Sequence, residues 1–366
     1  MADALKNIFT ESFIQDVAGA LGALIFDFDQ QKFISLIFND EWPGYELKQR
    51  MAHIAETMHP FLPDDFTGAA EILKSIPEKM HGGHEHERLA LMFIPNYVEH
   101  YGVDHPETAL SAMETITRFA SCEFAVRPLI KKYPEMLYPV LKKWAVNENY
   151  HVRRLASEGS RPRLPWAMAL HKLIDDPSPV LPVLELLKDD SSEYVRRSVA
   201  NHLNDISKDH PELAKRIFSE WIGFSANRDR LVKHGARTLL KSGDPDVMEL
   251  FGFRKPDHIL IKNFQILTPK IKTGDYLEFE VALKNEHPEK TNIRLEYAVY
   301  FLRSDGTYGK KVFRISEKIV QGDEEVELAK RHSFRKLSTR TYHPGKHGVS
   351  VIVNGVELGK KWFFLD

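Results

Sequence analysis

A carboxylate, several arginines and an indole occur together in residues 152–166, which read VRRLASEGSRPRLPW. Glu158 is followed by two arginines and, eight positions on, by Trp166. A carboxylate can stabilise developing positive charge and position a water molecule, and the face of an indole attracts a cation. Residues of these types at this spacing could act together on a positively charged group.

The helix that carries Glu158 is predicted to end at that residue. The sequence VRR at 152–154 begins an amphipathic pattern, and a copy at 195–197 continues it, whereas the first copy stops at Glu158-Gly159 and runs into a proline-stiffened segment. Gly159 is the expected residue after the helix, and a carboxylate at the negative end of a helix dipole is unfavourable by about 0.3–1 kcal/mol. The alternative is an irregular loop with a solvated glutamate and a core Trp166.

Two other acids are candidates for the same site. Glu123 lies in FASCEFAVRP (119–128), between two apolar helical stretches where a cleft position is plausible. The alternative is an acid at a helix N-terminus, where the dipole favours it. Asp205 follows the second VRR copy, and we expect it at the end of that helix. Each of these acids alone is weak evidence.

Cationic side chains recur at the same place in successive repeats, at a spacing that suits consecutive phosphates of a nucleic acid. The alternative is structural, since an arginine at this site commonly pairs with an acid of the neighbouring repeat. We expect one arginine of each pair to serve the structure and the other a ligand. The candidates are Arg153, Arg154, Arg161, Arg163, Arg196, Arg197, Lys233 and Arg237.

Other reactive groups carry weaker signals. His81, His84 and His86 lie in one segment, but no cysteine or carboxylate motif elsewhere partners them, so we expect no metal site. Cys122 is the only cysteine, which excludes an intramolecular disulfide and favours a reducing compartment. No histidine near Cys122 would activate the thiol, so we expect a small core residue. The common cofactor motifs are absent and no cofactor is expected.

The elements that must position these residues are helices as far as about residue 255. From Tyr133 onward the helices come in pairs, whose second members begin at Val152, Val195 and Leu231, 43 and 36 residues apart. Helix pairs at a period near 40 are typical of HEAT or armadillo-like solenoids. The clearest helical segments are 46–57, 106–121, 134–146, 180–188, 211–222 and 229–240.

Alignment of the three copies marks the first as unusual. Eight positions after the start, the second and third copies have Leu203 and Leu239, as a buried face requires, whereas the first has Ser160. Glu158 has no acidic counterpart in the other copies. The repeat itself therefore does not need an acid there.

Beyond residue 257 the pattern changes to short stretches rich in β-branched and aromatic residues, separated by turn sequences. Such stretches over about 110 residues predict an immunoglobulin-like β-sandwich without a disulfide. We therefore expect an all-α HEAT-like domain at residues 1–255 and an all-β immunoglobulin-like domain at 257–366. The predicted strands are 259–267, 276–284, 292–302, 310–319, 326–334 and 349–353.

The bulk composition is that of an ordinary globular protein. The 366 residues carry a net charge of −2, with 43% hydrophobic and 28% charged side chains. Cations outnumber acids between residues 123 and 165, which permits a face that binds a polyanion. The apolar run at 18–26 is too short to span a bilayer and lacks a basic leader. We expect a cytoplasmic monomer without a membrane partner.

Three strings together resemble a known family. The chain contains SCEFAVRP, HVRRLASEGSRPRLPW and YVRRSVANHLNDISKDHP in that order. These resemble the AlkC branch of the HEAT-like DNA alkylation-repair glycosylases, over essentially residues 1–255. The predicted sandwich at 257–366 is similar to the immunoglobulin-like domain that some AlkC members carry.

The resemblance implies a monofunctional DNA N-glycosylase that acts on double-stranded DNA. Its substrates would be cationic alkylated bases, chiefly 3-methyladenine and, for this branch, 3-methylcytosine, without insertion of the lesion into a deep pocket. Carried over by motif position, Glu123, Glu158 and Asp205 would be the active-site acids, with Trp166 packing against the lesion or its sugar. Arg154 and Arg161 would hold the acids or the DNA backbone. The resemblance leaves open which acid orients the water.

A second function fits the architecture alone. A helical solenoid joined to a β-sandwich is equally suited to a non-catalytic adaptor that grips a protein partner or undamaged DNA. Only the interrupted repeat and the motif strings favour the enzyme. A cluster of cations in the predicted sandwich, including Lys310, Lys311 and Arg314, also suggests that this domain contacts DNA.

Overall fold

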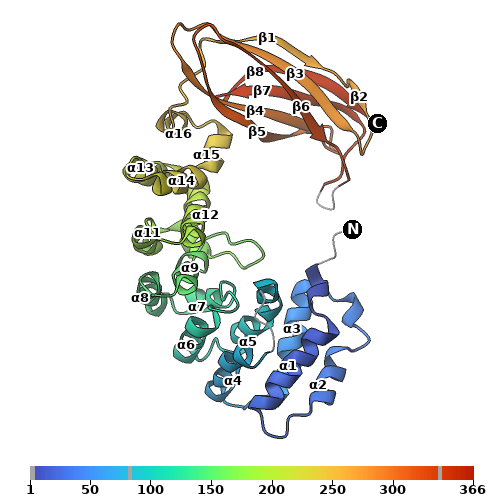
Figure 1. Cartoon of the computed structure of the whole chain (residues 1–366), viewed down its shortest axis with the longest axis vertical. Coiled ribbons are helices and arrows are strands. Elements are labelled where there is room, and N and C mark those ends of the chain that lie inside the picture. The colour runs from blue at the N-terminus through green and yellow to red at the C-terminus, as the bar shows by residue number, and fades with distance from the viewer. Residues whose placement is uncertain (1–4, 81–84, 337–339) are drawn as a thin grey trace. The chain divides into compact units, whose positions relative to one another are not determined.

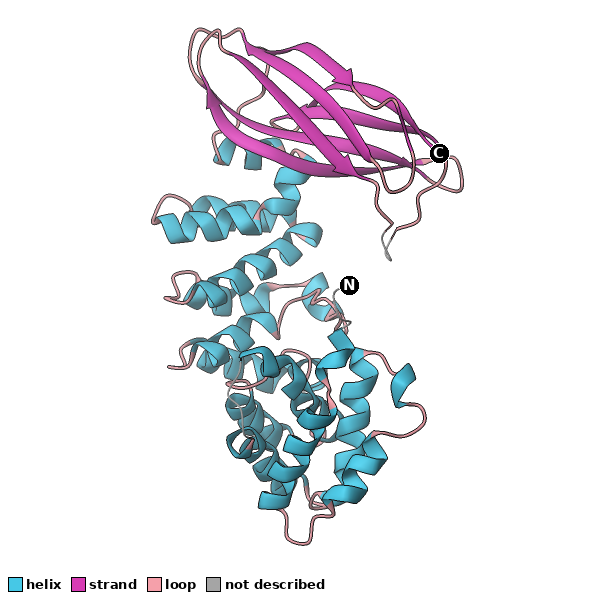
Figure 2. Cartoon of the chain, turned by 45° about the vertical axis from the view of Figure 1, so that its right-hand side comes forward, coloured by secondary structure: helices cyan, strands magenta, loops and turns pink. Residues whose placement is uncertain are grey.

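The computed structural model describes residues 5–80, 85–336 and 340–366, with the side chains of 85–88 left aside. Helices fill the first two thirds of the chain and strands the last third (Figures 1 and 2). The helices are α1 (Glu11–Leu24), α2 (Gln30–Ile37), α3 (Leu47–Met58), α4 (Phe66–Lys79), α5 (Phe93–Tyr101), α6 (Pro106–Ile116), α7 (Val126–Lys132), α8 (Pro134–Ala145), α9 (Tyr150–Glu158), α10 (His171–Asp175), α11 (Leu181–Leu187), α12 (Glu193–Asp209), α13 (Pro211–Trp221), α14 (Ala226–Gly235), α15 (Arg237–Ser242) and α16 (Pro245–Leu250).

The first arginine of each VRR sequence makes the same contacts in both copies of the repeat. Arg153 Nη1 donates to the carbonyls of residues 147 and 148 at 2.9 and 2.8 Å. Arg196 Nη1 donates to the carbonyls of 190 and 191 at 2.5 and 2.9 Å, again six and five residues earlier. Each arginine therefore ties its helix to the turn that precedes it. α8 packs on α9, α11 on α12, and α9 on α12, so the predicted helical-repeat fold is confirmed.

The two aligned helices differ in length as predicted, with nine residues in α9 and 17 in α12. Three helix ends differ from the prediction. The segment 106–121 is helical only to Ile116. The segment 229–240 is divided at Ala236 into α14 and α15, after Gly235, a poor residue for a helix interior. Asp205 lies inside α12, which continues to Asp209, because Ile206 supplies a further residue to its buried face.

The strands form two sheets whose inner faces share one apolar core. One sheet has the order β1-β3-β6 and the other β2-β8-β7-β4-β5. The predicted immunoglobulin-like sandwich is confirmed, and its Phe279, Leu295 and Phe363 are fully or almost fully buried. The strands are β1 (Ile259–Ile266), β2 (Lys270–Ile271), β3 (Tyr276–Asn285), β4 (Thr291–Leu302), β5 (Tyr308–Val320), β6 (Glu325–Ser333), β7 (Gly345–Val353) and β8 (Val356–Leu365).

The sequence prediction missed two strands. β2 has only two residues and pairs with the end of β8. β8 follows β7 through Asn354-Gly355, whose φ angles are 47° and 80°. Asn-Gly with two positive φ values is the preferred two-residue hairpin turn, so this signal for β8 was present in the sequence.

The chain folds into two compact units that do not coincide with the change from helix to strand. One unit comprises Met1–His210 and Ile222–Gly235, and the other comprises Pro211–Trp221 and Ala236–Asp366. Three helices, α13, α15 and α16, thus belong with the strands. The limits 1–255 and 257–366 therefore stay a prediction.

Within the described residues, no helix is long and apolar enough to cross a membrane. The same residues contain no group of three or more histidine, cysteine or acidic side chains placed to hold a metal ion. His81 and His84 lie outside the described residues, and the side chain of His86 is also not described.

Candidate active site

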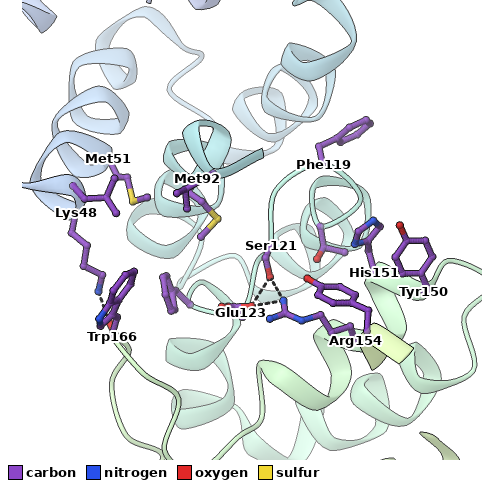
Figure 3. Close-up of a pocket in the computed structure, with 15 residues that line it drawn as sticks. Lys48, Met51, Met92, Phe119, Ser121, Glu123, Tyr150, His151, Arg154 and Trp166 are labelled. Atoms are coloured by element: carbon purple, nitrogen blue, oxygen red, sulfur yellow. Dashed lines mark hydrogen bonds and ion pairs between the residues drawn. The ribbon is translucent and has the colours of Figure 1, made fainter. Parts of the chain in front are cut away.

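A pocket of about 600 Å³ lies in the helical unit, where α3, α9 and α12 approach the segments that precede α7 and follow α9 (Figure 3). Glu123, Arg154 and Trp166, all singled out in the sequence, line it together. The full lining is Leu47, Lys48, Met51, Leu89, Met92, Thr117, Phe119, Ser121, Glu123, Phe124, Tyr150, His151, Arg154, Trp166 and Tyr194.

Glu123 is held at the pocket by two donors. Ser121 Oγ donates to Glu123 Oε2 at 2.7 Å. Arg154 Nη1 donates to the same oxygen and, at 2.7 Å, to Ser121 Oγ. Figure 3 shows the three side chains pointing toward one another. Since two donors that are also bonded to each other fix its direction, this carboxylate is preorganised rather than mobile.

Behind Arg154 the charges alternate into the protein. Glu158 Oε1 lies 3.7 Å from Arg154 Nη2 and accepts from Arg161 Nη1 at 2.6 Å. Arg161 Nε in turn donates to Asp205 Oδ2 at 2.9 Å. Lys208 Nζ ends the row with a 2.9 Å bond to Asp205 Oδ1. We call these residues the charged row; its members are Glu123, Arg154, Glu158, Arg161, Asp205 and Lys208.

The charged row runs from the pocket into the interior. Glu123 and Arg154 line the pocket, whereas Glu158 and Asp205 do not and are 5% and 1% exposed. Burial alone would lower the pKa of Arg154, but the adjacent Glu123 and Glu158 carboxylates outweigh burial and leave this pKa raised. The pKa of Arg161 is raised in the same way by Glu158 and Asp205, against the effect of burial. Both guanidinium groups therefore stay charged. Arg154 holds Glu123 and Glu158, and Arg161 holds Glu158 and Asp205.

The early end of α9 depends on close packing and on Arg127, a residue that the sequence analysis did not single out. Gly159 follows the last helical residue as predicted, and its φ of −64° and ψ of −30° are right-handed. A Cβ atom on Gly159 would lie 2.5 Å from Val126 Cγ1, so the glycine allows α9 to approach α7. Ser160 turns inward and its Oγ donates to the carbonyl of residue 156 at 2.7 Å.

Arg127 donates to carbonyls of the irregular segment that follows the short helix. Its guanidinium is fully buried and donates to the carbonyls of Gly159, Arg161, Pro162 and Met168 at 3.0, 2.7, 3.4 and 2.8 Å. Burial, together with the nearby Arg161 cation, lowers the pKa of Arg127 to about 10, so the group remains charged at neutral pH. Arg127 therefore fixes the path of the segment that carries Trp166.

Trp166 is not a core residue, as the structural alternative proposed, because it is 67% exposed. Its φ of 65° lies in the left-handed region, which is sterically unfavourable for a bulky residue. Lys48 Nζ, from α3, donates to the Trp166 carbonyl oxygen. The indole is thus presented to the pocket on a strained backbone (Figure 3).

The opposite side of the pocket has a second aromatic group that the sequence analysis missed. Tyr150, His151 and Tyr194 contact one another, with ring centroids 4.1 to 6.3 Å apart. The Arg154 guanidinium lies 4.7 Å from the centroid of the Tyr194 ring. The repeat could have signalled this group, since aromatic rings precede both VRR sequences and His151 aligns with Tyr194.

The remaining predicted cations lie away from the pocket lining. Arg153 pairs with both oxygens of Asp190, at 2.5 and 3.0 Å, and is the structural arginine of its pair. Arg163 pairs in the same bidentate manner with Asp209, at 2.9 and 2.8 Å. Arg197 pairs with the exposed Glu193, at 3.1 Å. Lys233 and Arg237 lie on α14 and α15.

Comparison with known proteins gives a consistent result over the whole chain. Residues 51–223 match the family described as DNA alkylation repair enzyme, and residues 260–366 match the C-terminal Ig-like domain of the uncharacterised protein YhaZ. The chain is 39% identical to the Bacillus subtilis (strain 168) protein YhaZ over 355 residues, 97% of each chain. It is also similar to the alkylpurine DNA glycosylase AlkC of Pseudomonas fluorescens, solved on DNA containing an abasic site analog. That similarity has a TM-score of 0.93, 32% identity and full coverage of both chains.

Proposed function

Since this chain belongs to the AlkC branch of the DNA alkylation repair enzymes, we propose that it is a DNA N-glycosylase. Its substrates would be positively charged alkylated bases in double-stranded DNA, with 3-methyladenine first and 3-methylcytosine second. The similar Pseudomonas protein is named as an alkylpurine DNA glycosylase and was solved with DNA.

One observation carries the proposal, namely how the pocket holds Arg154. The guanidinium is a planar cation that is bonded to the Glu123 carboxylate and lies over the Tyr194 ring, 4.7 Å from its centroid. A cationic methylated base is also planar and positively charged. A carboxylate and an electron-rich ring that bind a guanidinium also suit a cationic base, because both groups are planar and positively charged.

The chemistry that this site would support is hydrolysis of an N-glycosidic bond. The bond between the sugar C1′ and the base nitrogen breaks, and its electron pair goes to the base, which becomes neutral. The base needs no prior protonation because it is already charged. The oxygen of a water molecule then bonds to C1′, and the water releases a proton.

Two tasks remain for the protein, stabilising the oxocarbenium-like sugar and positioning the water. Glu123 faces the pocket and is our candidate for contact with the sugar or the water. A carboxylate about 4 Å from the cation contributes roughly 4 kcal/mol at an effective dielectric constant near 20. That energy corresponds to about three decades in rate. Glu158 and Asp205 would act through Arg154 and Arg161, by holding Arg154 in place against Glu123.

We propose further that the enzyme is monofunctional and forms no covalent bond with DNA. A lysine amine could attack C1′ and give a Schiff base. Of the described residues that line the pocket, one is a lysine, Lys48. Its Nζ is bonded to the Trp166 carbonyl and is therefore not free to attack C1′. Treatment of the reaction mixture with borohydride is therefore expected to give no protein–DNA adduct, and an adduct would contradict this part of the proposal.

The experiment that tests the function is a base-release assay on duplexes that each carry one defined lesion. We expect release of 3-methyladenine and 3-methylcytosine, and no release of the neutral base 7-deaza-adenine. Failure to release any base, from protein shown to bind the duplex, would overturn the enzymatic proposal. Binding that ignores lesions, without release, would instead indicate the adaptor.

A further inference from the structure

Lys48 lies in an unfavourable position within its own helix. It is the second residue of α3, where the positive end of the helix dipole disfavours a cation. The side chain is exposed and turns toward the pocket rather than into solvent alone (Figure 3). A contact outside α3 must therefore compensate the lysine at this position.

Lys48 contacts two segments of the pocket, one before α7 and one after α9. Lys48 Nζ donates to the Trp166 carbonyl oxygen, 118 residues away along the chain. The same Nζ lies 5.0 Å from the centroid of the Phe124 ring, a suitable distance for a cation–π contact. Phe124 follows Glu123, and Trp166 follows the interrupted α9. One ammonium group therefore reaches both the segment with the pocket carboxylate and the segment with the indole.

Arg127 holds the segment on either side of Trp166, through the carbonyls of residues 162 and 168, whereas the bond from Lys48 reaches Trp166 itself. The side chain of Trp166 is mostly exposed, so core packing does not fix the indole. Its left-handed backbone is unfavourable, and the neighbouring turn is closed by a long hydrogen bond, 3.3 Å from the nitrogen of residue 167 to the oxygen of residue 164. A charged donor on the Trp166 carbonyl is the type of contact that can maintain such a conformation.

We propose that Lys48 is a positioning residue for Trp166, and that through this contact α3 sets the direction in which the indole meets the damaged nucleotide. The inference rests on the proposed glycosylase function for its kinetic consequence. Lys48 acts through Trp166 and not by binding a DNA phosphate. Its loss therefore lowers the rate of base release from bound DNA more than it weakens binding.

A double-mutant cycle tests this coupling. Lys48→Met removes the ammonium and keeps the length of the side chain, and Trp166→Gly removes the indole at a backbone conformation that glycine adopts readily. With enzyme in excess over DNA, Lys48→Met is expected to slow release of 3-methyladenine about tenfold in the wild-type background. In the Trp166→Gly background it should change the rate less than about twofold. Equal effects in both backgrounds would overturn the proposal.

Two control variants and the salt dependence exclude other roles. Lys48→Arg, which keeps a cationic donor, should recover most of the rate. Lys32→Met, which removes an exposed lysine of α2, should leave the rate unchanged. If Lys48 instead bound a phosphate, Lys48→Met would reduce the slope of log affinity against log salt by about 0.9. Such a reduction would contradict the proposal.

A further measurement does not depend on catalysis. The difference in fluorescence between the protein and its Trp166→Phe variant reports on Trp166 alone. Lys48→Met should lower the anisotropy of this difference emission in the free protein, because the indole segment becomes more mobile, and Lys32→Met should not. An unchanged anisotropy would refute the coupling, even if the wild-type protein released no base and the proposed function failed.

Discussion

The helices α9 and α12 are copies of one repeat element, and they serve different purposes. Arg153 and Arg196 make the same two bonds to the turn before each helix. The next arginines differ, since Arg154 is bonded to Glu123 inside the pocket and Arg197 to the exposed Glu193. The repeat thus preserves the side chain that ties each helix to its preceding turn and varies the neighbouring arginine, which lines the pocket in α9 alone.

The lengths of the two helices explain the rest of the contrast. α12 buries Leu203 and continues, so its carbonyls are bonded within the helix. α9 stops with Ser160 at the equivalent place, and Arg127 takes up the carbonyls of the segment that follows. A shortened helix therefore requires a buried cation from a neighbouring helix, and in return gives a fixed loop beside the pocket. The following predictions test this comparison.

The largest effect is expected from removal of the cation that α9 needs and α12 does not. Arg127→Met removes the side-chain donor of three carbonyls and one of the two donors of the Pro162 carbonyl, so the free energy of unfolding should fall by about 4 kcal/mol. Arg197→Met on α12 should change it by less than about 0.5 kcal/mol. Denaturant titration measures both, and similar losses in the two variants would contradict the comparison.

The contact between the two helices should make stability depend on pH. His202 of α12 is bonded through Nδ1 to the Ser157 carbonyl of α9, 3.0 Å away, and burial lowers its pKa from 6.5 to about 4. Since the unfolded chain binds a proton at a higher pH, stability is complete above pH 6.5 and is lost as the pH falls toward 4. The contribution is about 3 kcal/mol.

The variant His202→Asn tests this pH dependence, since its amide can donate the same bond and does not titrate. Its unfolding free energy should fall less steeply between pH 6.5 and 4 than that of the wild type. Parallel curves for the two proteins would show that the pKa of His202 is the same in the folded and unfolded states.

A smaller effect is expected for the acid that only α9 carries. Glu158→Gln should slow base release at least tenfold, or about 1.4 kcal/mol, because the neutral amide no longer holds Arg154 and Arg161 as charged partners. Its matched control is Asn201→Ala at the equivalent position of α12, which should keep the rate within about twofold. Unchanged release by Glu158→Gln, in single-turnover measurements on folded protein, would remove Glu158 from the mechanism.

The smallest effect separates the two kinds of arginine. Arg197→Gln should reduce the slope of log affinity for DNA against log salt by about 0.9, at little cost in stability, because this exposed cation is available to a phosphate. Arg153→Gln should leave the slope unchanged and lower stability, since it breaks the bidentate pair with the buried Asp190. A smaller salt slope for Arg153→Gln and a loss of stability for Arg197→Gln would contradict the structural role of Arg153 and the DNA-binding role of Arg197.

Much of the fold could be predicted because it depends on local periodicity. The repeat spacing, the interruption after Glu158 and most strands follow from the spacing of apolar residues, although α9 and α12 begin two residues before Val152 and Val195. β8 was missed although Asn354-Gly355 signalled it. The break between α14 and α15 was missed because the apolar residues keep helical spacing across it. The backbone leaves the helical conformation only at Ala236, whose ψ is 0°.

The site was predicted less completely, for a physical reason. Acids and arginines with unusual local surroundings, such as Glu158, could be selected from the sequence. Arg127 and Lys48 could not, because their importance comes from carbonyl groups 32 to 118 residues away. The left-handed conformation of Trp166 is likewise set by tertiary contacts and has no signature in the residue type.

The charged row has one more consequence, for how a damaged base is told from an intact one. Its three carboxylates and three cations sum to no net charge, yet Glu123 stands at the pocket end and Lys208 at the other. Such a row is an electric dipole whose field weakens steeply with distance. It does not repel the DNA backbone or attract cations from afar, and it favours a positive base only at contact. Discrimination by this row would therefore occur after binding and be insensitive to salt, unlike the affinity for DNA.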